Sequence, residues 1–194
     1  FQGARQTGSR NSLRETARLS YNPWETESGY TYPGVYLGNK KVLQFGGGID
    51  HQADYKGYSA DAFISLPIGV APATTPPPAT PVSRDAVNAE LTLLAFDGGT
   101  TFATGATAIP EQKAATMQLG YYISQFKIMP WGRLEKQDFR ASANNGRDNN
   151  RQQVGLTWFP GGNNFNVKAA YSRVSPRVGT TTNEYTVQVQ FFYY

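Results

Sequence analysis

The chain has no cysteine and only one histidine among its 194 residues. Disulfides and cysteine-ligated metal sites are therefore excluded, and His51 has no second imidazole or thiolate with which to share a metal ion. We expect no metal site and no cofactor. Carboxylates such as Asp50 and Asp61 could face each other across a hairpin, but nothing else in the sequence supports glycosidic chemistry. We therefore expect that the protein is not an enzyme.

The sequence also lacks long apolar runs and clusters of basic residues. No stretch approaches the ~20 apolar residues of a membrane helix, so the chain could cross a bilayer only as strands of a closed barrel. Its Lys and Arg residues are scattered and its net charge is +4, a pattern that does not favour nucleic-acid binding. Residues 1–5 show no charged-then-apolar leader, and we expect the chain to begin partway through a longer protein.

What the sequence does contain is a regular alternation of apolar and polar residues. Apolar residues make up 39% of the chain and aromatic residues 13%, which favours sheets with one solvated face. The last segment, residues 184–194, alternates and then ends in an aromatic cluster, as the closing strand of an outer-membrane barrel does. In this segment the outward-facing residues end at Tyr193, so the alternation would place the last residue, Tyr194, on the polar face.

Nine segments share this two-face pattern and predict nine strands, most of a length that suits a tilted membrane-crossing strand. They cover residues 13–21, 43–50, 58–66, 87–95, 116–124, 127–137, 153–158, 165–172 and 184–194. A tight turn is expected near residues 54–57, and a hairpin at Gln125 and Phe126. Gly46, Gly47 and Gly48 do not form a phosphate-binding loop, because no Lys-Ser/Thr follows. They predict strand curvature or the close approach of another element.

The alternation assigns charged residues to one face and aromatic residues to the other. The polar face would line an aqueous lumen and carries Arg14, Arg18, Asp50, Asp61, Glu90, Arg133, Glu135, Lys168 and Glu184. Because the signs are mixed, we expect no strong charge preference, and Arg133 and Glu135 are expected to pair with neighbours on adjacent strands. The boundary aromatics expected on the lipid-facing side are Tyr21, Tyr121, Trp158, Tyr171, Tyr185, Phe191 and Tyr193.

The predicted connections differ in length between the two ends of the sheet. Residues 97–113, 138–150 and 175–182 form long connections at one end, and the Gln125 region and residues 160–164 form short ones at the other, as in bacterial barrels. Two long segments break this rule: residues 22–40, and the proline-rich residues 67–85, which we expect to be an extended linker. The aromatic residues of the first, Trp24, Tyr30, Tyr32 and Tyr36, fit either a membrane-boundary belt or a plug-like contact.

Several motifs resemble a known family. They are RLSYN at 18–22, YLGNKKVL at 36–43, GGG at 46–48, MPWGRLEK at 129–136, VGLTWF at 154–159 and NVK at 166–168 before Tyr171. Together they are similar to the C-terminal half of Gram-negative phosphate-selective porins O and P. The resemblance covers most of the chain, but the crowded basic pore lining on which that family's phosphate selectivity depends is not evident here.

This resemblance implies an all-β fold, a transmembrane antiparallel β-barrel. Residues 1–194 would be the C-terminal part of one barrel domain and supply about nine of ~16 strands. It further implies a homotrimer in the outer membrane of a Gram-negative bacterium, with outer-membrane lipid and lipopolysaccharide as partners. The implied function is passive diffusion of small hydrophilic solutes or ions, including anions such as phosphate. Other interpretations are a structural barrel that holds protein partners and a soluble β-sandwich.

Overall fold

A computed structural model describes residues 12–26, 35–69, 83–99, 109–140 and 147–191. These residues form nine β-strands: β1 (Arg14–Tyr21), β2 (Val42–Gln52), β3 (Tyr55–Pro67), β4 (Ala86–Asp97), β5 (Gln112–Tyr122), β6 (Ile128–Phe139), β7 (Asn149–Trp158), β8 (Phe165–Pro176) and β9 (Thr182–Phe191). The predicted all-β fold and the nine predicted strands are confirmed. No described segment is a helix of the length and apolarity needed to cross a membrane.

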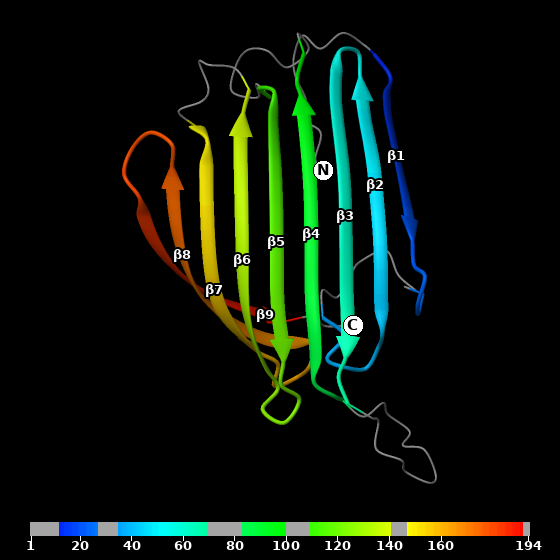
Figure 1. The fold of residues 1–194 in the computed structure, drawn as a ribbon, viewed down its shortest axis with the longest axis vertical. Helices are drawn as coiled ribbons and strands as arrows, with labels where there is room; N and C mark the ends of the chain where they lie inside the picture. Colours follow the sequence, from blue (N-terminus) through cyan, green and yellow to red (C-terminus); the bar gives the residue numbers. More distant parts are fainter. Residues whose placement is uncertain (1–11, 27–34, 70–82, 100–108, 141–146, 192–194) are drawn as a thin grey trace.

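The strands form one antiparallel sheet in which each strand pairs only with its neighbours in sequence, in the order β1 to β9. Figure 1 shows that β1 to β6 stand side by side and that β7 to β9 curve round behind them, so that the sheet forms a trough. The connections β1–β2, β3–β4, β5–β6 and β7–β8 lie at the lower end in this view, and the other four lie at the upper end.

The sheet is not closed within the described residues, since β1 and β9 do not pair with each other. Both edge strands are exposed along almost their whole length. Leu19 on β1 is 80% exposed and Tyr185 on β9 is 84% exposed. Because each strand reverses direction, the two edge strands run parallel to each other.

One side-chain register runs through the whole sheet. In β5, Gln118 pairs with Glu90 of β4 and Arg133 of β6. The next residue, Leu119, pairs with Ala89 and Gly132. Since side chains alternate between faces with period two, all polar positions of the predicted alternation meet on one face and the apolar positions meet on the other. We call these the inner face and the outer face.

A short segment after β1 covers part of the inner face. Residues 35–41, which we call the strap, place Val35 against a buried cluster at the lower end of the sheet. The cluster comprises Val35, Ala86, Tyr122, Met129, Trp131 and Phe159, with Leu37 and Ala170 packed against it. Tyr122 and Phe159 meet edge to face, with ring centroids 5.8 Å apart. The strap therefore supplies the cover of a small apolar core inside the trough.

The predicted strand limits differ most, by four residues each, at the start of β5 (Gln112 instead of Thr116), at the end of β8 (Pro176 instead of Ser172) and at the start of β7. The sequence pattern started the seventh strand at Gln153, but β7 begins at Asn149. Residues 149–152 are all polar, so they show no alternation even though they pair with β6 and β8. The hairpin expected at Gln125 and Phe126 is confirmed, since residues 123–127 join β5 to β6. The tight turn expected near residues 54–57 lies instead at Ala53 and Asp54, because β3 already begins at Tyr55.

Asp85 fastens the lower turn between β5 and β6 to the start of β4. The backbone N–H and the hydroxyl of Ser124 both donate to its Oδ1 at 2.8 Å, and the Tyr121 hydroxyl donates to Oδ2 at 3.0 Å. Donation from the Ser124 backbone, and then from its side chain, lowers the pKa of Asp85 below the ordinary value of 3.8. The charged form of Asp85 therefore stabilises this end of the sheet.

We expect Asp85→Asn to lower the urea midpoint of unfolding at neutral pH, because the amide keeps an acceptor but loses the charge. Because folding lowers the pKa of Asp85, the wild type is more stable than the variant at pH values above the ordinary aspartate pKa. This difference in stability is lost as the pH falls through the pKa of Asp85 in the folded protein. Paired urea titrations of wild type and variant at about pH 7 and about pH 2 measure this. Glu15→Gln is the matched control, and an equal deficit of Asp85→Asn at both pH values would contradict the assignment.

Candidate functional site

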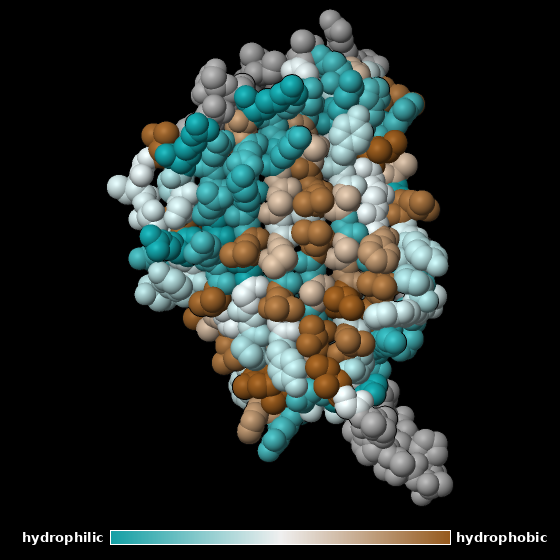
Figure 2. Space-filling model, in the orientation of Figure 1, coloured by the Kyte–Doolittle hydropathy of each residue, from teal (hydrophilic) through white to brown (hydrophobic). Residues whose placement is uncertain are grey.

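The outer face carries a belt of exposed apolar side chains. Figure 2 shows hydrophobic residues gathered across the middle and lower part of this face, with hydrophilic residues above them. The belt includes Leu19, Phe45, Ile49, Tyr58, Leu91, Leu93, Met117, Leu119, Leu134, Val154, Leu156, Val187 and Val189, each at least 40% exposed. An apolar surface of this extent is not solvated favourably and marks a contact with lipid or protein.

The upper limit of the belt is marked on every strand by an outward polar residue. These residues are Glu15, His51, Lys56, Asp97, Lys113, Lys136, Gln152, Arg173 and Asn183. The boundary residues of β1 to β4 pair directly with one another across the strands, and so do those of β7 to β9.

Between these two groups of strands the limit steps down. Lys113 pairs with Ala95, Lys136 with Ala115, and Gln152 with Leu134. On each of these strands, the polar boundary residue thus pairs with the outward apolar residue that lies directly below the boundary residue of the preceding strand. Three steps of two residues amount to about 20 Å along the strands. The belt therefore runs obliquely to the strands, as a level band does on tilted strands.

The predicted boundary aromatics lie on the outer face at the limits of this belt. Tyr21, Tyr121, Trp158 and Phe191 are the last outward residues of β1, β5, β7 and β9 at the lower end. Tyr171 and Tyr185 lie at the upper limit on β8 and β9, with ring centroids 5.3 Å apart. Tyr193, and the phase of Tyr194, lie outside the described residues.

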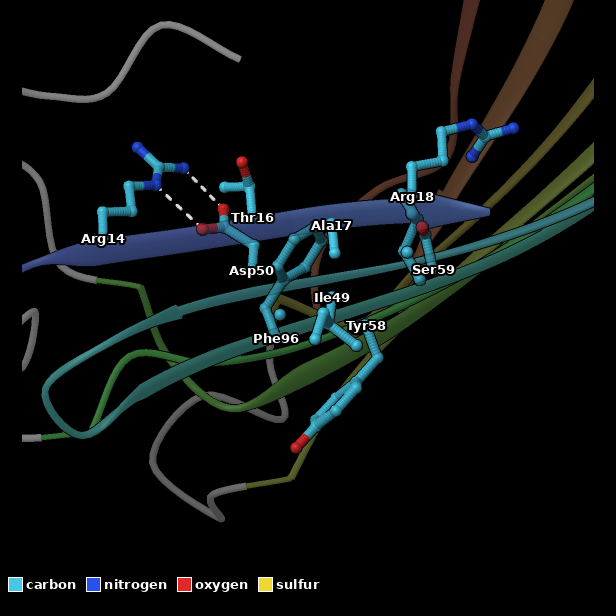
Figure 3. A pocket seen from close by; sticks show the side chains of 12 residues that line it. Arg14, Thr16, Ala17, Arg18, Ile49, Asp50, Tyr58, Ser59 and Phe96 are labelled. Atoms are coloured by element: carbon cyan, nitrogen blue, oxygen red, sulfur yellow. Dashed lines mark hydrogen bonds and ion pairs between the residues drawn. The ribbon is translucent and has the colours of Figure 1, made fainter. Parts of the chain in front are cut away.

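All nine charged residues predicted on the polar face lie on the inner face, and four of them form two ion pairs that join different strands. Arg14 donates to Asp50 through Nε at 2.8 Å and Nη2 at 2.5 Å. Arg18 donates to both oxygens of Asp61, at 2.7 and 2.8 Å. Figure 3 shows the Arg14–Asp50 pair beside Thr16 on the same face. Such two-pronged pairs hold both side chains in fixed positions.

The Arg18–Asp61 pair spans a strand, and glycine makes this possible. Arg18 belongs to β1 and Asp61 to β3, with β2 between them. A Cβ at Gly46 of β2 would lie 2.5 Å from Arg18 Nη2 and 2.6 Å from Asp61 Oδ2. Only a residue without a side chain fits beneath the pair. This agrees with the expectation that the glycine run marks a close approach, and the approaching groups are side chains of the two neighbouring strands.

The remaining inner-face charges are arranged differently from the prediction. Arg133 and Glu135 were expected to pair across strands, but they pair with each other along β6 at 2.6 Å. Glu184 pairs with Arg151 of β7, a residue that the shorter predicted seventh strand did not include. Lys168 lies over the Trp131 ring at 5.5 Å. Among the described residues it forms no ion pair.

Asp50 and Asp61 do not face each other. Asp50 pairs with Gly57 and Asp61 with Gly46, four positions apart in the register, and each carboxylate is held by its own arginine. No group of three His, Asp or Glu side chains gathers among the described residues. At the inward positions of the nine strands, five basic residues (Arg14, Arg18, Arg133, Arg151 and Lys168) match five acidic ones (Asp50, Asp61, Glu90, Glu135 and Glu184), so these strand positions carry no net charge.

A hollow of 520 Å³ lies at the upper end of the inner face, near the Arg14–Asp50 pair (Figure 3). Gly48 and Gly57 line it, and Leu94 and Phe96 supply apolar surface beside the charged groups. The arginines and carboxylates around it are already paired.

Trp131 is an inner-face residue that the sequence analysis did not single out. It pairs with Gly120 of β5 on one side and Gly155 of β7 on the other. Its indole lies over Gly155, where an added Cβ would be 2.3 Å from Cζ2, and its Nε1–H donates to Thr157 Oγ1 at 3.1 Å. The sequence signal that could have identified Trp131 is the glycine that lies opposite it on each neighbouring strand, because these glycines leave space for a large ring.

Comparisons with family models, curated proteins and solved structures found no match to this chain. The resemblance to phosphate-selective porins stays a prediction from the motifs, and the functional argument depends on the geometry of the two faces.

We expect Gly155→Ala to lower the free energy of unfolding by about 1–3 kcal/mol, because the new methyl group would force the Trp131 indole aside. Gly132→Ala is the matched control, since its Cβ would meet nothing closer than Gln153 O at 3.8 Å. Urea titration followed by tryptophan fluorescence measures both variants. Equal effects would show that the indole does not lie over Gly155.

Proposed function

We propose that this chain forms one wall of an outer-membrane β-barrel channel through which small hydrophilic solutes diffuse passively. The outer face would meet lipid and the inner face would line water. The mechanism needs no catalytic group, because the channel width excludes large solutes and the inner-face charges adjust the passage of ions.

The observation that carries this proposal is the oblique apolar belt opposite a charged inner face. On β4 the outward apolar residues from Val87 to Ala95 extend about 27 Å at ~3.4 Å per residue. At a strand tilt of ~40° this corresponds to about 21 Å across a membrane, close to the ~25 Å band of outer-membrane barrels. Its lower limit carries aromatic rings, which favour the membrane–water interface.

The exposed edges support a barrel that is completed by further strands. An open sheet edge in lipid would leave backbone groups without hydrogen bonds. Since β1 and β9 run parallel, antiparallel closure needs an odd number of additional strands between them. Seven would give the ~16 strands that the family resemblance implies. A trimeric assembly and a place in a Gram-negative outer membrane are part of the same proposal.

The balanced charge of the described inner face bears on the transported solutes. A ring of one sign would favour counter-ions, but here five basic groups face five acidic ones, and most of them are paired. We therefore propose general diffusion with weak charge selectivity. Phosphate-type anion selectivity would require basic residues on other strands.

A structural barrel without a conducting pore is the second candidate. The strap and its apolar cluster fill part of the trough, and a filled barrel would serve as a scaffold for protein partners.

Planar bilayers distinguish the two candidates. We expect the purified protein to produce stepwise conductance in symmetric KCl, with a reversal potential close to zero in a salt gradient, because the inner face is balanced. A folded, membrane-inserted protein that never conducts would overturn the channel and favour the scaffold. A strongly anion-selective reversal potential would overturn the weak selectivity.

The assignment of the two faces can be tested with neighbouring residues of β5. Leu119 faces outward and is 54% exposed, whereas Gln118 faces inward. Leu119→Arg places a charge within the apolar belt and should cost about 2–4 kcal/mol of folding free energy in lipid bilayers. Gln118→Arg is the matched control and should have a small effect on stability. Equal losses for both would contradict a lipid-facing belt.

A further inference from the structure

We propose that the strap, residues 35–41, is a fixed internal constriction that sets the narrowest aperture of the channel at its lower end. This inference depends on the proposed channel function. It adds that solute size is limited there by the strap, and not by the sheet wall alone.

The strap is attached at widely separated points of the trough. The Ser83 hydroxyl donates to Leu37 O at 2.7 Å, beside the start of β4. Asn163 Nδ2, in the turn between β7 and β8, donates to Val35 O at 3.0 Å. The Tyr36 ring lies 6.0 Å from that of Phe63 on β3. The strap thus crosses the inner face from β3 to the β7–β8 turn.

Apolar packing holds the strap inside the trough. Val35 is only 7% exposed within the cluster that includes Met129 and Trp131. Leu37 packs against the same cluster. A Cβ added at Gly162 would lie 3.6 Å from Leu37 Cδ1, so Leu37 also lies close to the β7–β8 turn. Burial on the inner face therefore keeps the strap within the trough.

The backbone of the strap is also adapted to this close fit. Leu37 has a φ of 50° and Gly38 a φ of 72°. A left-handed conformation is unfavourable for leucine, so the surrounding contacts must maintain it. A Cβ at Gly38 would lie 1.8 Å from Arg84 O. The turn at Leu37 and Gly38 thus lies directly against the chain that leads into β4.

Polar side chains of the inner face, among them Ser65 and Asn88, are buried at the lower end of the sheet, where the strap lies. Ser65 pairs with Val42, the residue that follows the strap. Ser65 of β3 is 0% exposed and Asn88 of β4 is 6% exposed, although both occupy inner-face positions. Among the residues that the structure describes, no group donates a hydrogen bond to Ser65 Oγ or Asn88 Oδ1. Buried polar atoms without a partner are rare in native proteins, and each one calls for an explanation. We attribute the burial of these two inner-face positions to the strap, which lies at the same end of the sheet.

The absence of cysteine in the chain allows a direct test of the cover. Ser65→Cys places one thiol beneath the strap, and Thr186→Cys places one on the exposed inner face of β9. We expect a charged, water-soluble thiol reagent to modify Thr186→Cys at least tenfold faster. Adding Val35→Asp should release the strap and bring the two rates within about threefold. Rapid modification of Ser65→Cys with Val35 intact would overturn the inference, whether or not the protein conducts.

Single-channel conductance tests the aperture. We expect Val35→Asp, and more mildly Asn163→Ala, to increase conductance by about 1.5-fold or more, because each removes an attachment of the strap. Val178→Asp in the β8–β9 connection, where Val178 is 68% exposed, is the matched control and should leave conductance unchanged. Asn163→Ala keeps the apolar cluster, so it remains informative if Val35→Asp does not fold.

The two proposals fail in different ways. A wild type that inserts but does not conduct overturns the channel itself. A wild type that conducts, with folded strap variants of unchanged conductance, overturns only the constriction.

Discussion

A single side-chain register through nine strands is the constraint on which the rest of the structure depends. A slip of one residue in any strand would turn its polar side chains outward and its apolar ones inward. No disulfide fixes the register, since the chain has no cysteine. It is maintained instead by the backbone ladders and by side-chain contacts between strands, such as Arg14–Asp50 and Arg151–Glu184.

Glycines decide what the inner face can hold. Gly46 leaves space for an ion pair that spans one strand, and Gly155 leaves space for an indole. In both cases the large group comes from a neighbouring strand and lies over the glycine backbone. The inner face thus combines fixed, paired charges at one end with an aromatic cluster at the other. This division provides a polar wall and a narrowed end without any helix or inserted domain in the described residues.

The sequence was sufficient for the strands, because alternation with period two is a local signal. It failed at residues 149–152, where both faces are polar, and with them it missed Arg151 as the partner of Glu184. The assignment of Asp50, Asp61 and Lys168 to one face was correct, since face follows directly from parity. Their partners could not be predicted, because the Arg18–Asp61 contact depends on Gly46 in a third strand and on the curvature of the sheet. The Tyr36 ring lies against Phe63 on the inner face, whereas Tyr30 and Tyr32 of the same connection lie outside the described residues.

The strap also has a consequence for the order of assembly. Neighbouring strands join residues that are close in sequence, so hairpins can form successively with small loops to close. The hydrogen bond between Asn163 and Val35 joins residues 128 positions apart. It cannot form until the intervening strands have curved into a trough that brings the β7–β8 turn back to the strap. The protection of Ser65 beneath the strap therefore reports a late folding event, the bending of the finished sheet.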